Sequence, residues 1–154
     1  PEPPGEESVL AIRPQQAHPV PEPLVRALEA LRHELNIPDD FPPAVHDAAV
    51  AAAAAPRLPS LDRTDLELVT IDPEGSRDLD QAVLIDTADT GFTVWYAIAD
   101  VAAFVHLGDP IDVEAHRRGQ TLYAPQRRLP LHPPELSEGA ASLRPDQVRP
   151  ALLG

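Results

Sequence analysis

Three aspartates, Asp72, Asp78 and Asp80, lie close together in the stretch TIDPEGSRDLDQA, and Gln81 follows them directly. Alternate side chains of an extended segment share a face, so Asp78 and Asp80 are expected on one face, about 6–7 Å apart along the backbone. Gln81 is expected to point the other way unless the strand bends. Carboxylates crowded into a cleft repel one another unless a divalent cation or several donors hold them ionised.

The spacing of these acids leaves two interpretations open. Oxygen ligands alone favour magnesium or manganese over zinc, which makes the stretch a candidate metal site. Aspartate and glycine are also ordinary turn residues, so an acidic surface turn has the same composition. An EF-hand fits poorly, because its ligands need a 12-residue loop closed by glutamate and flanked by helices.

The segments around the acidic stretch are typical of strands. TDLELVTID and GFTVWYAIAD alternate polar and apolar residues and are rich in Val, Ile, Thr and aromatic residues. A further strand is expected over residues 82–85, paired with residues 92–99 through a turn at 86–91. The sequence therefore predicts a sheet that supports the acidic loop.

Three helices are expected around this sheet. PLVRALEALRHELNI spaces its leucines as one face of an amphipathic helix that ends before Pro38. The alanine-rich segment between Pro42 and Pro56 predicts a second, weakly packed helix. DPIDVEAHRRGQ predicts a short third helix, with Pro110 in its first turn and Gly119 at its end.

These elements predict an α+β fold, with a mixed sheet and flanking helices. Residues 1–23 are rich in Pro, Glu and Gln and are expected to form a leader or linker. Residues 24–60 are then a helical connector, and residues 61–154 hold the sheet. The Pro-rich segment TLYAPQRRLPLHPPELSEGAASL is expected to be an ordered, functional loop with short helical turns.

Composition limits the possible functions. The 154-residue chain has no cysteine, which excludes disulfides, thiolate metal sites and cysteine nucleophiles. Its net charge of −13 argues against general nucleic-acid binding, although every cation is arginine, a good ligand for phosphate. No apolar run approaches the roughly 20 residues that span a bilayer, so a cytoplasmic protein without membrane contact is expected. The chain lacks methionine even at position 1, and we expect it to be a piece of a longer polypeptide.

Four motifs occur in an informative order: TIDPEGSRDLDQAV, YAIADVAAFV, RRGQTLYAP and LPLHPPELSEGAASLRPDQVRPA. Together they resemble the first part of the RNB catalytic domain of the ribonuclease II and ribonuclease R family. The resemblance runs from about Leu61 to the end, and a weaker likeness covers the segment from Ile37 through FPPAVHDAA. It implies that residues 61–154 are the incomplete N-terminal part of an RNB nuclease domain, preceded by the Pro-rich leader and two helices.

The resemblance implies a magnesium-dependent 3′ to 5′ exoribonuclease, with manganese as a possible substitute. Such enzymes thread the 3′ end of single-stranded RNA into a channel and release 5′-nucleoside monophosphates. Asp72, Asp78 and Asp80 match three of the four acidic positions of the family, and Asp80 matches the one on which its chemistry depends most. Gln81 replaces the fourth aspartate; its amide oxygen is still a possible metal ligand but has no charge.

The resemblance also implies contacts with RNA and with further domains. Tyr123 matches an aromatic residue that stacks on a base near the 3′ end, with a core tyrosine as the alternative. Arg127 and Arg128 are candidate phosphate contacts, or solvated surface charges. The remainder of the RNB domain and a C-terminal S1-type domain are the expected partners. This piece alone is expected to be inactive.

Two other functions remain open. Gln81 is compatible with an RNB-like protein that binds RNA but is catalytically impaired, and an acidic cation-binding domain unrelated to RNA is the third possibility.

The histidines give no indication of a metal site. His106, His116 and His132 lack the spacing of a metal triad and are expected on the surface. Ser142 has no nearby base motif and needs no role as a nucleophile.

Overall fold

The computed structural model describes residues 20–35, 37–38, 40–124 and 127–154, and the chain divides into two compact units, residues 1–36 and 37–154. The first unit contains helix α1 (Glu22–Glu34), the amphipathic helix that the leucine spacing predicts. None of its residues is buried, and Leu35 is 60% exposed. Leu24 and Leu31 on the leucine face of α1 are also exposed.

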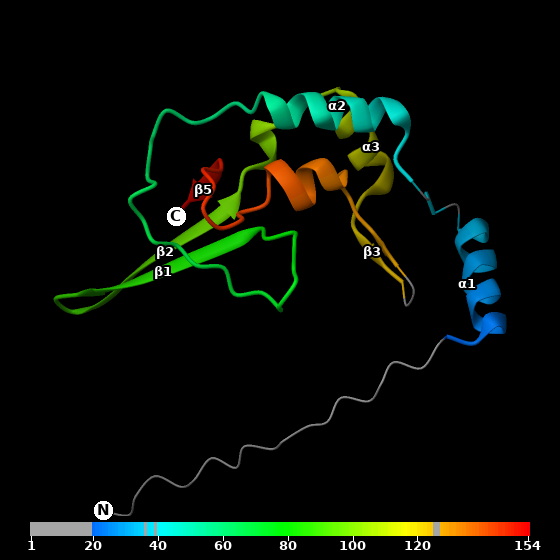
Figure 1. The fold of residues 1–154 in the computed structure, drawn as a ribbon, viewed down its shortest axis with the longest axis horizontal. Helices are drawn as coiled ribbons and strands as arrows, with labels where there is room; N and C mark the ends of the chain where they lie inside the picture. Colours follow the sequence, from blue (N-terminus) through cyan, green and yellow to red (C-terminus); the bar gives the residue numbers. More distant parts are fainter. Residues whose placement is uncertain (1–19, 36, 39, 125–126) are drawn as a thin grey trace, which may run out of the picture. The chain divides into compact units, whose positions relative to one another are not determined.

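The core of the second unit forms around helix α2 (Pro43–Ala54), which packs against helix α3 (Pro110–Arg118) and the short π-helical turn η2 (Leu136–Ala140) (Figure 1). Val45 and Ala49 of α2 are buried, and Ala49 is completely inaccessible. The prediction that this helix is weakly packed was wrong, because small alanine side chains let the neighbouring elements approach closely. The buried cluster comprises Phe41, Val45, Ala49, Ala103, Phe104, Ile111, Leu136 and Ala141.

The sheet is built on the predicted hairpin. Strand β1 (Gln81–Ala88) pairs antiparallel with β2 (Gly91–Ala99), with Gln81 opposite Ile98. The turn is shorter than predicted, and Gly91 following it has a φ of 103°, a conformation that glycine adopts most easily. Strand β5 (Ala151–Leu153) pairs antiparallel with β2, which gives the order β1-β2-β5. The α+β class is confirmed.

The strand expected over residues 64–72 is largely wrong. In this segment the structure has one isolated bridge, in which Val69 and Val83 exchange backbone hydrogen bonds of 2.9 Å. At the start of the segment, Asp62 accepts hydrogen bonds from the backbone N–H and the hydroxyl of Thr64. Local side-chain bonds of this kind compete with the pairing of a strand.

Helix α3 begins and ends as predicted. The side chain of Asp109 accepts a hydrogen bond from the backbone N–H of Asp112, and Gly119 follows the last turn with a φ of 77°. Burial pushes the pKa of Asp109 upward, but hydrogen bonds from three backbone N–H groups outweigh it and hold the pKa below its ordinary value. A short turn of 3-10 helix, η1 (Val101–Ala103), precedes α3.

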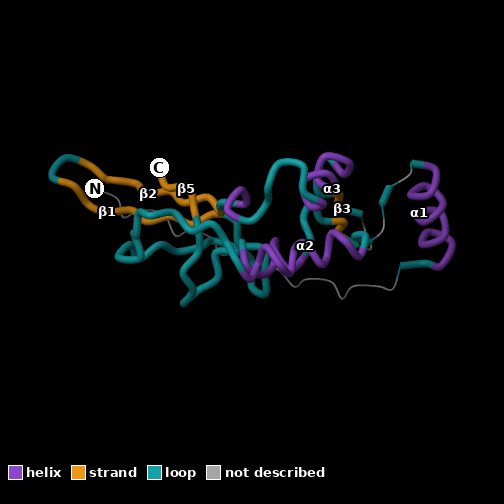
Figure 2. The backbone as a smooth tube through the Cα atoms, turned by 90° about the horizontal axis from the view of Figure 1, so that it is seen from above, coloured by secondary structure: helices purple, strands orange, loops and turns teal. Residues whose placement is uncertain are grey.

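The Pro-rich segment contains the expected helical turn, η2, and also a small hairpin that was not predicted. Its strands are β3 (Leu122–Tyr123) and β4 (Arg128–Leu129). Figure 2 shows that, within the second unit, the sheet lies toward one end and α2, α3 and β3 toward the other, with loops between them. Among the described residues, no helix is long and apolar enough to cross a membrane.

Candidate active site

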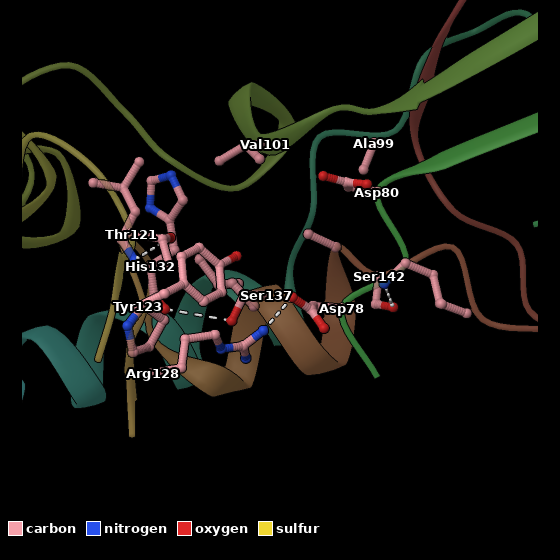
Figure 3. Close-up of a pocket in the computed structure, with 15 residues that line it drawn as sticks. Asp78, Asp80, Ala99, Val101, Thr121, Tyr123, Arg128, His132, Ser137 and Ser142 are labelled. Atoms are coloured by element: carbon pink, nitrogen blue, oxygen red, sulfur yellow. Dashed lines mark hydrogen bonds and ion pairs between the residues drawn. The ribbon is translucent and has the colours of Figure 1, made fainter. Parts of the chain in front are cut away.

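A cavity of about 220 Å³ lies where the loop before β1, the β3–β4 hairpin and η2 meet (Figure 3). Its wall combines acidic, basic, hydroxyl and aromatic side chains from segments far apart in the sequence. The polar and aromatic residues that line it are Asp78, Asp80, Thr121, Tyr123, Arg128, His132, Ser137 and Ser142.

Ser142 fastens the acidic loop to the body of the second unit. It is 2% exposed, its hydroxyl donates to the carbonyl of Arg77 at 2.7 Å, and the same oxygen accepts from the backbone N–H of Leu79 at 3.0 Å. The N–H of Leu143 donates to the carbonyl of Leu79 at 2.7 Å. Leu79 is buried, and it lines the cavity together with Asp78 and Asp80 on either side of it.

Asp78 and Arg128 form an ion pair inside the cavity wall (Figure 3). The other terminal nitrogen of Arg128 donates to Oε1 of Glu138 at 2.6 Å, so the guanidinium lies between two carboxylates. Arg77 also approaches Glu138, with 3.7 Å between Nε and Oε2. The side chain of Arg128 is 26% exposed and takes part in a network of charges, so it is not the solvated charge that the sequence also allowed.

The four candidate metal ligands are not all brought together. Asp80 lines the cavity, and its backbone carbonyl accepts from the N–H of Ala99 at 2.9 Å. Asp72 is exposed and lies outside the cavity lining. Gln81 begins β1 and accepts a hydrogen bond from the hydroxyl of Tyr96 on the neighbouring strand, so its amide is engaged away from the cavity.

Of the three candidate RNA-contact residues, two line the cavity and one does not. Tyr123 lines the cavity and is 77% exposed, which does not fit the alternative of a core tyrosine. Arg128 lies in the wall as described. Arg127 does not line the cavity, and its guanidinium lies 3.7 Å from a carboxylate oxygen of Asp40.

His132 is a cavity residue that the sequence analysis placed wrongly on the surface. Burial lowers the pKa of its imidazole below the ordinary value, which favours the neutral ring at neutral pH. Its Nδ1 is buried and has no hydrogen-bond partner among the described residues. The spacing of His132 from the other histidines gave no indication that its ring is buried.

The donors in the cavity suit a magnesium ion that is shared with a substrate. Magnesium in proteins is usually held by one or two carboxylates, with water and substrate phosphate completing its octahedron. Asp78 and Asp80 supply two carboxylates of this kind. Over the described part of the chain, no three His, Asp or Glu side chains are placed to hold a metal by themselves.

The chain matches a known family of protein domains in both sequence and fold. The sequence model of the RNB domain matches residues 61–153, and the chain belongs to the RNB domain family. Ribonuclease R of Mycoplasma genitalium is 44% identical to the chain over 89 residues, which are 57% of this chain and 12% of that protein. Ribonuclease R of Vibrio parahaemolyticus is 35% identical over 147 residues, covering 95% of this chain and 16% of that protein.

Exoribonuclease 2 of Serratia proteamaculans is 42% identical over 96 residues, which are 62% of this chain and 15% of the relative. The apo form of Mycoplasma genitalium RNase R superimposes with a TM-score of 0.72 and 34% identity, over 86% of this chain and 21% of that one. The same enzyme in complex with ribose-methylated single-stranded RNA gives a TM-score of 0.72 and 33% identity, with the same coverage. The chain thus spans less than a quarter of each of these proteins.

Proposed function

We propose that the intact protein to which this chain belongs is a 3′ to 5′ exoribonuclease that hydrolyses single-stranded RNA to 5′-nucleoside monophosphates. The observation that supports this most is the cavity, which joins Asp78 and Asp80 with an exposed aromatic ring, Tyr123, in a chain of the RNB family. The related RNase R of Mycoplasma genitalium has been solved with bound RNA. The substrate we propose is therefore the 3′ end of single-stranded RNA.

The residues of the cavity have separate roles in this proposal. Tyr123 offers its ring to a base near the 3′ end, and stacking of this kind contributes about 1–3 kcal/mol per base. Asp78 and Asp80 would hold magnesium, or manganese in its place. When bound, the cation would polarise the phosphoryl group and activate a water, so that no protein nucleophile is needed.

Asp72 and Gln81 can bind the cation only after a change in conformation. For Asp72 to bind the cation, the loop between it and Asp78 has to fold toward the cavity. For Gln81 to do so, its amide has to leave the hydroxyl of Tyr96. The two carboxylates of the cavity wall are therefore the first ligands that we assign.

The proposal includes partners beyond this chain. The remainder of the RNB domain and a C-terminal S1-type domain complete the RNA channel in the intact protein, which acts on RNA in the cytoplasm. The net charge of −13 makes such added contacts necessary, because affinity for RNA depends on cations that neutralise phosphates.

The test is hydrolysis of 5′-labelled single-stranded RNA by the intact protein. We expect a ladder that shortens to a small 5′ limit product in magnesium, with release of 5′-monophosphates. Chelator and Asp80→Asn both abolish it, because each removes the cation or a ligand to it. Asp86→Asn is the matched control, since Asp86 is exposed on β1 and outside the cavity. Continued shortening by Asp80→Asn would refute the proposed role of the cavity.

A catalytically impaired, RNA-binding protein is the second candidate. The hydrogen bond between Gln81 and Tyr96 favours it, since an amide engaged elsewhere leaves the cation fewer ligands. In the same experiment this protein binds RNA but leaves its length unchanged in magnesium and in manganese.

A further inference from the structure

Arg128 connects three segments of the cavity wall. Its guanidinium, which projects from β4, pairs with Asp78 in the loop before β1 and with Glu138 in η2, at 2.6 Å from Oε1. All three side chains are partly shielded from solvent, with exposed fractions of 26% for Arg128, 41% for Asp78 and 26% for Glu138. The arginine thus neutralises one of the two carboxylates assigned to the cation.

An arginine in this position competes with a cation. A cation bound between Asp78 and Asp80 meets a like charge at short range, and it has to draw the Asp78 carboxylate away from an existing ion pair. Glu138 offers the guanidinium a second carboxylate that stays in place when the first one leaves.

We propose that Arg128 is a positioning residue that exchanges partners during substrate binding, an inference that rests on the proposed function. Without metal, Arg128 holds Asp78; when the cation and RNA enter together, Asp78 turns to the cation. Glu138 then retains the guanidinium at the cavity wall, where the freed N–H groups donate to an RNA phosphate. Arg128 therefore weakens binding of the cation alone and strengthens binding of RNA with the cation.

The test measures Mn²⁺ binding and RNA binding separately on the intact protein. Free Mn²⁺ is followed by electron paramagnetic resonance in the absence of RNA, and RNA affinity is measured by fluorescence anisotropy with non-hydrolysable single-stranded RNA and Mn²⁺. For Arg128→Gln we expect about three- to tenfold tighter Mn²⁺ binding, as loss of one nearby like charge predicts. We expect the same variant to bind RNA more weakly. A purely structural role of Arg128 would not strengthen Mn²⁺ binding and weaken RNA binding at the same time.

A second test variant and a control variant complete the experiment. Among the described residues, Glu138→Gln leaves Asp78 as the one carboxylate that pairs with Arg128, so the variant is expected to bind Mn²⁺ more weakly. This variant decides the question if Arg128→Gln does not fold. Arg144→Gln is the charge-matched control, because Arg144 is exposed and does not line the cavity, and it leaves Mn²⁺ affinity unchanged.

The outcomes separate this inference from the proposed function. If the unaltered protein binds Mn²⁺ through Asp80 but Arg128→Gln binds it equally well or less tightly, the partner exchange is refuted and the metal site stands. If the unaltered protein binds no Mn²⁺ at millimolar concentration, both the metal site and the exchange are refuted.

Discussion

Individual hydrogen bonds decide where the acidic side chains of the cavity lie. Ser142 is the clearest case, because one buried hydroxyl contacts the backbone on both sides of Asp78. Besides it, the bond between Leu143 and Leu79 and the ion pair between Arg77 and Glu138 join the segment that holds both carboxylates to η2 and its neighbours. Ser142 is therefore a structural residue of the site and not a nucleophile.

Ser142→Ala is expected to lower the free energy of unfolding by about 1–3 kcal/mol, because the buried N–H of Leu79 loses its acceptor. Urea denaturation of the intact protein measures this change. Ser137→Ala is the control, since within the described part of the chain the Ser137 hydroxyl makes only long bonds of 3.3 and 3.4 Å to backbone carbonyls. Equal stability of the two variants would show that the Ser142 bonds do not hold the loop.

Asp78 and Asp80 were predicted to share one face, and both line the cavity. Asp78 and Asp80 are two residues apart in an extended segment, so a shared environment follows from backbone geometry alone. The partners of these acids did not follow. Arg128 and Ser142 lie 50 or more residues along the chain, and His132 has no local pattern that indicates burial. Only the folded chain brings such residues together.

At the scale of elements, helix α3 is fixed by a buried carboxylate. Glu114 is 5% exposed and accepts hydrogen bonds from Arg117 at 2.6 and 2.8 Å and from Arg118 at 2.8 Å. Arg118 in turn donates to the carbonyl of Asp40 and lies 3.7 Å from the centre of the Phe41 ring. These contacts attach α3 to the segment that leads into α2.

Glu114→Gln is expected to cost about 1.5–3 kcal/mol of folding free energy near neutral pH, because charge-assisted hydrogen bonds are lost. Hydrogen bonds from Arg117 lead the effects that lower the pKa of Glu114 below its ordinary value of 4.5. A carboxyl whose folded pKa is depressed stabilises the protein above its unfolded pKa and loses that contribution as the pH falls through the folded value. The stability difference between the two proteins is therefore expected to be constant above about pH 5 and to shrink below pH 4.5.

Urea denaturation at several pH values checks this expectation. Glu67→Gln is the control, because Glu67 is exposed and the substitution removes the same charge. A stability difference for Glu114→Gln that stays constant down to pH 3 would contradict the buried ion pair.

Elements with strong local signals were predictable, and those that depend on distant partners were not. The helices follow from spacing, proline and glycine, and the β1–β2 hairpin follows from alternation around a turn. Residues 64–72 alternate equally well, yet they form only the Val69–Val83 bridge. The β3–β4 hairpin has two residues in each strand, too few for a periodic pattern.

At the scale of the whole molecule, the chain corresponds to a small part of its relatives. It spans 12–16% of the length of the related ribonucleases compared above, and its sheet exposes large apolar side chains, including Ile85, Phe92 and Val94. Contiguous exposed apolar surface of this kind is typical of an interface. We expect the remainder of the RNB domain to cover it, and the completed channel to bring RNA to the cavity.

The measurement that tests the central claim most directly is the crystal structure of the intact protein with Mn²⁺ and a short single-stranded RNA, located by the anomalous scattering of manganese. The account predicts a manganese peak in the cavity, bound by Asp78 and Asp80, with the RNA 3′ end beside Tyr123. A cavity without manganese, or RNA bound at another surface while Asp78 remains paired with Arg128, would contradict it.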